Sequence, residues 1–233
     1  MELFVTKSDM KIGCFIKFMA PEYVDSFLNE GLLYMNTLEY FRTYEEEDKH
    51  LRADCYEGLA ASYDSQSVEM TLVKDGTRIE PIGKIDVFQP LADSINVYCM
   101  TMITHHDLRT SFKLDKKFEK FGSKAVLIEG AGLHKFMERL HKAIESDVNL
   151  GSIYPSRKVA GSVEYVRRED HHQNLDVFNK FNDYSWQREY RIALGREIGA
   201  GALSLKLGDI SDIVQVVDTT ELMNMVFALK KSL

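Results

Sequence analysis

Hydrophobic residues along the chain fall into short extended runs that are separated by helical stripes and polar turns. Runs rich in β-branched, aromatic and aliphatic residues predict strands over residues 2–6, 14–19, 95–103, 124–129, 159–166 and 213–217. The run INVYCMTMI at 95–103 is the most apolar, so we expect a central strand that is buried on both faces. The pair Asp75-Gly76 between two further extended runs predicts a β-hairpin.

Helices are predicted where apolar residues recur with helical spacing behind a start signal. Pro21 opens the first helix and Gly31 ends it, and Thr37 caps a second, short helix. A longer stripe covers residues 131–146, and Asp218 and Glu221 have capping-box spacing ahead of a last helix. These elements predict an α+β fold in which helices flank a mostly antiparallel or mixed sheet, with residues 1–233 forming one domain.

The composition narrows the classes of protein to which the chain can belong. Its 233 residues are 45% hydrophobic, which is enough for a substantial core, and its net charge of -7 argues against nonspecific binding to nucleic acid. No apolar run reaches the roughly 20 residues of a membrane span, and the first residues lack a signal-peptide layout. We therefore expect a cytoplasmic protein with no membrane partner. Three distant cysteines and two isolated His-His pairs lack zinc-ligand spacing, which predicts reduced thiols and no metal site.

The segment FNKFNDYSWQREYRIAL at residues 178–194 carries the candidate chemistry. We predict that its second half, from residue 186, is a strand with Gln187, Glu189 and Arg191 on one face and with Trp186 and Tyr190 on the apolar face behind them. One interpretation is a half-exposed strand on which Glu189 and Arg191 form an ion pair in water. The other is an active-site strand with a Gln-x-Glu motif, in which one carboxylate stabilises a developing positive charge.

Four short motifs, taken in chain order, carry a resemblance to a known superfamily. They are FIKF at 15–18, EGLLYMNTLEYFR at 30–42, VYCMT at 97–101 and the strand with Gln-x-Glu. Over about residues 14–194 the chain resembles the ADP-ribosyltransferase-like superfamily. It is also similar to small bacterial domains of unknown function that occur with abortive-infection phage-defence genes. The resemblance implies a split core of two bent antiparallel sheets, with NAD bound in the cleft between them.

The same resemblance implies roles for individual residues. Glu189 matches the catalytic glutamate that holds the nicotinamide ribose, and Gln187, two positions earlier, matches a residue that helps to place the acceptor. Lys17 falls where a first-strand Arg or His is expected, and Thr101 matches part of a polar second-strand motif. The residues expected to bind NAD are Lys17, Thr101, Tyr34 as a candidate for stacking on nicotinamide, and Arg191 on the face of Glu189.

These roles imply an enzyme that uses NAD as a substrate, either an ADP-ribosyltransferase or an NAD glycohydrolase. The resemblance further implies that such an enzyme acts as a toxin or a phage-defence effector. The acceptor of ADP-ribose is not identified by the sequence. Lys17 and the tripeptide Cys99-Met100-Thr101 depart from the family pattern, in which Ser-Thr-Ser is frequent. These departures favour the alternative, a catalytically inactive member of the superfamily that binds a protein partner as an antitoxin or a sensor.

Overall fold

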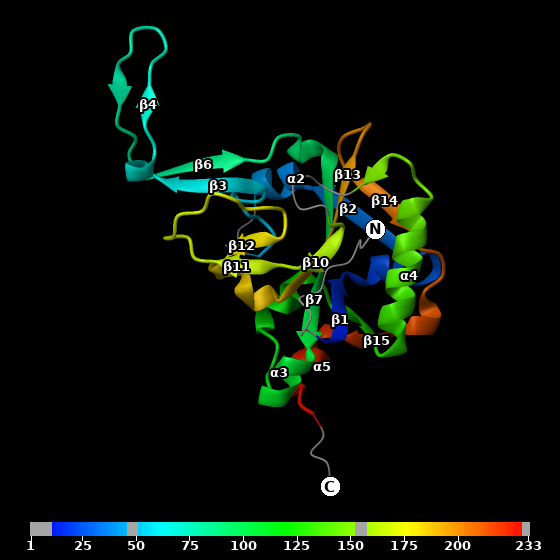
Figure 1. Ribbon diagram of the computed structural model, residues 1–233. Helices are drawn as coiled ribbons and strands as arrows, with labels where there is room; N and C mark the ends of the chain where they lie inside the picture. The colour runs from blue at the N-terminus through cyan, green and yellow to red at the C-terminus, as the bar shows by residue number, and fades with distance from the viewer. Residues whose placement is uncertain (1–10, 46–50, 152–157, 230–233) are drawn as a thin grey trace.

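The computed structural model describes residues 11–45, 51–151 and 158–229 and has an α+β fold with mostly antiparallel sheets and few helices (Figure 1). Its strands are β1 (Ile12–Met19), β2 (Leu32–Thr37), β3 (Leu59–Asp64), β4 (Met70–Thr71), β5 (Arg78–Ile79), β6 (Lys84–Phe88), β7 (Ile95–Thr104), β8 (Lys124–Glu129), β9 (Leu150–Gly151), β10 (Ala160–Ser162), β11 (Glu164–Val166), β12 (Asn179–Phe181), β13 (Glu189–Arg196), β14 (Leu203–Lys206) and β15 (Val214–Asp218). Its α-helices are α1 (Val24–Glu30), α2 (Leu38–Thr43), α3 (His105–Thr110), α4 (Ala131–Glu145) and α5 (Thr219–Met223). Short 3₁₀ helices are η1 (Pro21–Tyr23), η2 (Ser65–Ser67), η3 (Ala92–Ser94), η4 (Lys116–Phe121), η5 (Asn182–Gln187) and η6 (Ser211–Ile213).

Strand β7 organises the principal sheet, which has the order β10-β13-β7-β1-β8-β15. Along one edge β7 pairs with β13, from Ile95 opposite Gly195 to Thr101 opposite Glu189. Two strands share its other edge: β2 pairs with residues 96–97, and β1 pairs with residues 101–104. Within the described chain, residues 98–100 therefore have no strand partner on that edge. The sheet is split where β1 and β2 diverge, and this split positions the site.

Alternating side chains place a hydrophobic core on each face of the sheet. On β1, Phe15 packs into a core that includes Phe136 of α4, whereas Ile16 and Phe18 pack into a core closed by η4 and α5. Helix α4 lies along the side of the sheet in Figure 1 because its apolar stripe faces that first core. Among the helices of the described ranges, none combines the length and the apolar character needed to cross a membrane.

A smaller group of strands lies beside the split. Strands β3 and β6 pair with each other, and the β4–β5 hairpin projects from them, away from the rest of the molecule (Figure 1). Strands β11 and β12 form a parallel pair. The turn at residues 51–58 leads into β3, and β12 leads into η5, so that both bring side chains to the split of the principal sheet.

Most of the predicted elements are confirmed. Strands occupy the runs at 14–19, 95–103 and 124–129, and β7 is buried along nearly its whole length. The Thr37 hydroxyl accepts a hydrogen bond from the Tyr40 amide at 3.1 Å, and Gly31 ends α1 with a left-handed φ of 58°. The Asp75-Gly76 hairpin is also present. The strand predicted at residues 2–6 lies outside the described residues.

Predictions near the C-terminal half were less accurate. The single strand predicted at 159–166 is two strands, because β10 pairs with β13 whereas, from Glu164 onward, the chain pairs with β12. The last strand was also predicted to be buried, but β15 is at the sheet edge and is partly exposed. Asp218 and Glu221 do not form a capping box. The Asp218 carboxylate pairs instead with Lys124 Nζ at 2.6 Å, and α5 is a short helix.

Candidate functional site

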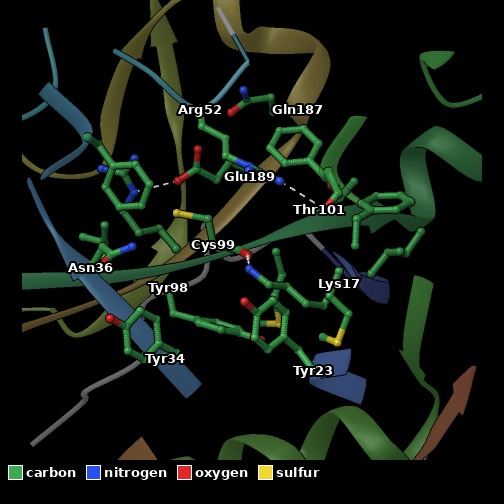
Figure 2. Close-up of a pocket in the computed structure, with 18 of the residues that line it drawn as sticks. Lys17, Tyr23, Tyr34, Asn36, Arg52, Tyr98, Cys99, Thr101, Gln187 and Glu189 are labelled. Carbon is green, nitrogen blue, oxygen red and sulfur yellow. Dashed lines mark hydrogen bonds and ion pairs between the residues drawn. The ribbon is translucent and has the colours of Figure 1, made fainter. Parts of the chain in front are cut away.

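A cavity of about 800 Å³ opens at the split of the sheet (Figure 2). This volume is typical of sites for small molecules and cofactors. Glu189 and Gln187 lie together with Arg52 at one end of the view in Figure 2, Tyr34 and Tyr23 lie at the other, and Cys99 and Lys17 lie between them. All of the site residues predicted from the sequence line this cavity: Lys17, Tyr34, Thr101, Gln187, Glu189 and Arg191.

The segment that carries Gln187 and Glu189 is not one continuous strand. Residues up to Gln187 form the 3₁₀ helix η5, Arg188 adopts a left-handed conformation with a φ of 47°, and β13 begins at Glu189. Arg188 is held there by a charge-assisted hydrogen bond to Asp107, which is itself fixed in the capping box of α3. The turn at Arg188 brings Gln187 to the cavity although it is not in the strand.

The prediction of a shared apolar face behind the motif was therefore wrong for Trp186. Tyr190 is buried in the core with Phe15, whereas Trp186 packs against Phe118 and Phe121 in the core on the opposite face of the sheet. The period-2 pattern was correct from Glu189 onward. Glu189 and Arg191 are on the face opposite Tyr190, as strand geometry requires.

Four buried charges form a closed ring at the floor of the cavity. The Arg191 guanidinium binds both oxygens of Glu57, at 2.6 and 3.1 Å, and its Nε binds Glu189 Oε1 at 2.7 Å. Lys180 Nζ closes the ring, at 3.1 Å from Glu189 Oε2 and 3.7 Å from Glu57 Oε2. We call Glu57, Arg191, Glu189 and Lys180 the charge ring. Because the side chains of Glu189 and Arg191 are 3% and 1% exposed, the interpretation of a surface ion pair in water is wrong.

The charge ring keeps Glu189 ionised. Burial disfavours the charged carboxylate, but Arg191 and Lys180 outweigh this effect and hold the pKa of Glu189 well below its usual range. Burial likewise opposes the charge on Lys180, but Glu189 and Glu57 raise its pKa. Buried ion pairs contribute little net stability, because desolvation offsets much of their attraction. The ring is therefore better suited to keeping charged groups beside the cavity than to stabilising the fold.

The side chain of Gln187 is engaged by the protein at both ends of its amide. Its Nε2 donates to the Leu51 carbonyl at 2.6 Å, and its Oε1 accepts from Lys180 Nζ at 3.5 Å. The segment at 51–54 is anchored further by Tyr184, whose hydroxyl donates to the Ala53 carbonyl at 2.8 Å. Gln187 thus joins the 51–54 segment to the charge ring.

Lys17 reaches the cavity from β1 at the split. Its Nζ donates to the Cys99 carbonyl at 2.8 Å and lies 4.1 Å from the centre of the Tyr98 ring. In the part of the chain that the structure describes, no carboxylate forms an ion pair with this ammonium. Burial lowers the pKa of Lys17, partly offset by Cys99 and Glu189. The Cys99 carbonyl is available to Lys17 because no strand of the described residues pairs with this edge of β7 there.

Thr101 and Cys99 present their side chains beside the charge ring. Thr101 is directly opposite Glu189 in the pairing of β7 with β13, and Cys99 is directly opposite Arg191. Burial and the negative charge of Glu189 raise the pKa of the Cys99 thiol to about 12. Cys99 is therefore a neutral thiol at physiological pH and a poor nucleophile.

Exposed tyrosines surround the mouth of the cavity. Tyr23, Tyr34 and Tyr40 all line it and are 62%, 58% and 40% exposed. A large aromatic ring that is both exposed and adjacent to a cavity offers a planar surface for stacking on a ligand. The cavity therefore combines an ionic floor, a cationic wall at Lys17 and an aromatic mouth.

Glu57, Lys180 and Asp54 were not among the residues predicted from the sequence. Lys180 lies between Phe178 and Phe181, and a buried ammonium requires a buried acidic partner. The sequence by itself shows neither that Lys180 is buried nor which carboxylate is its partner. Asp54 and Glu57 belong to a turn that is far away in the sequence and carries no motif with a known role.

Metal ligands are not grouped in the described residues, where no three or more His, Cys, Asp or Glu side chains could hold an ion. The second His-His pair has structural contacts: His171 Nδ1 accepts from the Asp64 amide at 3.3 Å, and His172 bridges to Ser62. Comparisons of the chain with protein-family models, with curated proteins and with solved structures found no match.

Proposed function

We propose that the protein binds NAD in the cavity at the split sheet and cleaves it, as an ADP-ribosyltransferase or NAD glycohydrolase with an ADP-ribosyltransferase-like core. The observation that carries the proposal is the ionised Glu189 carboxylate at the floor of a cavity of about 800 Å³ that also has a cationic wall and an aromatic mouth. NAD has a group for each part: a cationic nicotinamide riboside, a pyrophosphate and two aromatic bases.

In the proposed reaction the bond between ribose C1′ and the nicotinamide nitrogen breaks, and its electron pair leaves with nicotinamide. Glu189 stabilises the positive charge that develops on the ribose, because a carboxylate fixed beside that charge interacts more strongly with the transition state than with NAD. An oxygen or nitrogen atom of the acceptor, or the oxygen of a water molecule, then bonds to C1′ and loses its proton to solvent. Lys17 binds a phosphate, Tyr34 stacks on nicotinamide, and Thr101 and Arg191 complete the floor.

The role of Gln187 under this proposal differs from simple acceptor placement. Its amide already contacts Leu51 and Lys180, so it must exchange a partner before it can bind an acceptor. We therefore expect Gln187 to affect the conversion of NAD through the arrangement of the floor as well as through the acceptor. A toxin or phage-defence effector remains the proposed setting.

The test is release of nicotinamide from NAD, with Glu189→Gln beside the wild type. The variant keeps the shape of the side chain but removes its charge, so kcat should fall by about 10² to 10³. Binding of NAD should persist. It can be followed through the fluorescence of the single tryptophan, Trp186, because this residue packs on Phe118 and Phe121, which line the cavity. An exposed carboxylate on η5 offers the control Asp183→Asn, which should behave as wild type. Full activity of Glu189→Gln would exclude this mechanism.

A specific observation favours a second candidate, the catalytically inactive binding module. Both carboxylate oxygens of Glu189 already have cationic partners, Arg191 at 2.7 Å and Lys180 at 3.1 Å, which partly neutralise the charge that catalysis needs. This module would bind a protein partner or a nucleotide without cleaving it. It predicts that the wild type releases no nicotinamide at any pH. It also predicts that Glu189→Gln binds the ligand as the wild type does.

A further inference from the structure

Lys180 is the only member of the charge ring that lies between two cavities of the described chain. It lines the main cavity with Glu189, and it also lines a second, much smaller cavity together with Asp54. The second cavity has a volume of about 10 Å³, which is close to the minimum for one water molecule. There is thus a small free space that is lined by both Lys180 and Asp54.

Three carboxylates surround that ammonium at graded distances. Lys180 Nζ is 3.1 Å from Glu189 Oε2, 3.7 Å from Glu57 Oε2 and 4.0 Å from Asp54 Oδ2. All of these side chains are buried, at 6% exposure for Lys180 and 2 to 3% for the carboxylates. A shift of about 1 Å would bring Nζ from its contact with Glu189 to hydrogen-bonding distance from Asp54.

Asp54 is the carboxylate that can receive the ammonium. Glu57 is less able to do so because Arg191 already binds both of its oxygens, at 2.6 and 3.1 Å. Oδ1 of Asp54 accepts from the Tyr56 amide at 3.0 Å, which fixes the carboxylate, while Oδ2 is directed at Lys180 from 4.0 Å. The distance leaves Asp54 with an incompletely paired charge.

We propose that Lys180 is a movable counter-ion, which neutralises Glu189 in the resting site and shifts toward Asp54 as positive charge develops on the bound ribose. Asp54 is then a positioning residue that acts through Lys180 and has no contact with substrate. The inference rests on the proposed function, and it explains how a carboxylate with two cationic partners becomes available to a cationic transition state. No bond is made or broken in the shift, and only the ammonium moves.

The state of Asp54 gives the proposal a pH signature. Burial raises the pKa of Asp54 to about 6, although Lys180 acts to lower it. Since only the ionised carboxylate attracts the ammonium, kcat should rise as the pH increases through about 6. The charged and titratable groups that face Asp54 are Cys55, Tyr56, Glu57, Lys180, Tyr184 and Arg191. Among the described residues that line the main cavity there is no histidine that would produce the same rise.

The experiment measures nicotinamide release from NAD between pH 5 and 8 for the wild type, Asp54→Asn and the control Asp183→Asn, with NAD affinity from Trp186 fluorescence. Asp54→Asn should lower kcat about tenfold at pH 7.5, leave the Kd for NAD within about twofold, and abolish the rise of kcat near pH 6. Asp54→Glu should restore part of kcat and part of its rise near pH 6. A merely structural role predicts an equal loss at every pH with the rise retained, and that result would overturn the proposal.

A second variant keeps the inference testable if Asp54→Asn does not fold. Lys180→Arg retains the charge, but its planar guanidinium binds Glu189 through two hydrogen bonds and is harder to displace. It should bind NAD normally with a lower kcat, and an unchanged kcat would overturn the proposal. Failure of the wild type to release nicotinamide would overturn the proposed function and this inference together. Release by the wild type with an unaffected Asp54→Asn would overturn the inference alone.

Discussion

Replacement of Arg191 by Met tests whether the charge ring is a buried network whose members depend on one another. The guanidinium makes four charge-assisted contacts, two with Glu57, one with Glu189 and one with the Val177 carbonyl at 2.6 Å. At about 1.5 kcal/mol each, these contacts amount to about 6 kcal/mol. Part of this is offset because Met, unlike Arg, is buried without desolvating a charge. Removal of one partner of a buried pair typically costs about 3 to 5 kcal/mol, and we expect that loss here.

The loss should be measurable as a lower melting temperature and a lower midpoint of urea unfolding. For a chain of this size, about 3 to 5 kcal/mol corresponds to about 6 to 20 °C. The difference from wild type should also depend on pH. The pKa of Glu189 is lower in the folded than in the unfolded protein, so its ionisation contributes stability above about pH 4.3 that is lost as the pH falls. The variant lacks most of this contribution, so the difference between the two proteins should be largest above about pH 4.3 and should shrink only as the pH falls well below that value.

The matched control is Arg167→Met, which removes an exposed arginine. Arg167 pairs with Glu169 at 3.7 Å, and both side chains are mostly exposed. Such a pair contributes at most about 1 kcal/mol, so the control should melt within about 4 °C of wild type. If Arg191→Met were no more destabilising than this control, the charge ring would not be the buried network described above.

Two further predictions concern stability. Asp54→Asn should raise the melting temperature by a few degrees at pH 7.5 and have little effect near pH 4. The reason is that the pKa of Asp54 is raised to about 6 in the folded protein, so its ionisation costs stability as the pH rises through that value. An equal shift of the melting temperature at both pH values would contradict this origin. Gly122→Ala should destabilise by about 2 to 4 kcal/mol, since φ is 150° and a Cβ would lie 2.1 Å from the Met19 carbonyl carbon. The matched control is Gly76→Ala, because Gly76 also has a positive φ, of 75°, but a Cβ there would have no atom within 4 Å. This control should lower the free energy of unfolding by only about 1 kcal/mol. Equal losses of unfolding free energy for the two variants in urea would show that the close contact at Gly122 is unimportant.

Features of the fold that depend on neighbouring residues were predictable from the sequence. The apolar run of β7 predicted a central strand, because only a strand covered on both faces can bury such a run. The cap at Thr37 and the end of α1 at Gly31 were predictable because each depends on residues within one or two helical turns. The shared face of Glu189 and Arg191 followed from the period of a strand.

The conformation around Gln187 was decided by tertiary contacts. Periodicity extended the strand back to Trp186, but Arg188 adopts a left-handed conformation and pairs with Asp107, which lies 81 positions earlier. No local propensity favours a positive φ at an arginine. The turn is therefore a consequence of the tertiary contact between Arg188 and Asp107 of α3, and it is what places Gln187 and Trp186 in different environments.

The partners of the site carboxylates were likewise beyond the reach of the sequence. The chain showed a lysine in an aromatic run and a glutamate two residues before an arginine, and both patterns also occur on ordinary protein surfaces. Arg191 finds Glu57 across 134 positions of sequence, and Lys180 finds Glu189 across a change from strand to 3₁₀ helix and back. Local pattern determined which residues face the cavity from β13. The packing of the 51–58 turn and β12 beside β13 decided which distant charges meet there, because a buried charge selects its partner by position in space and not by position in the chain.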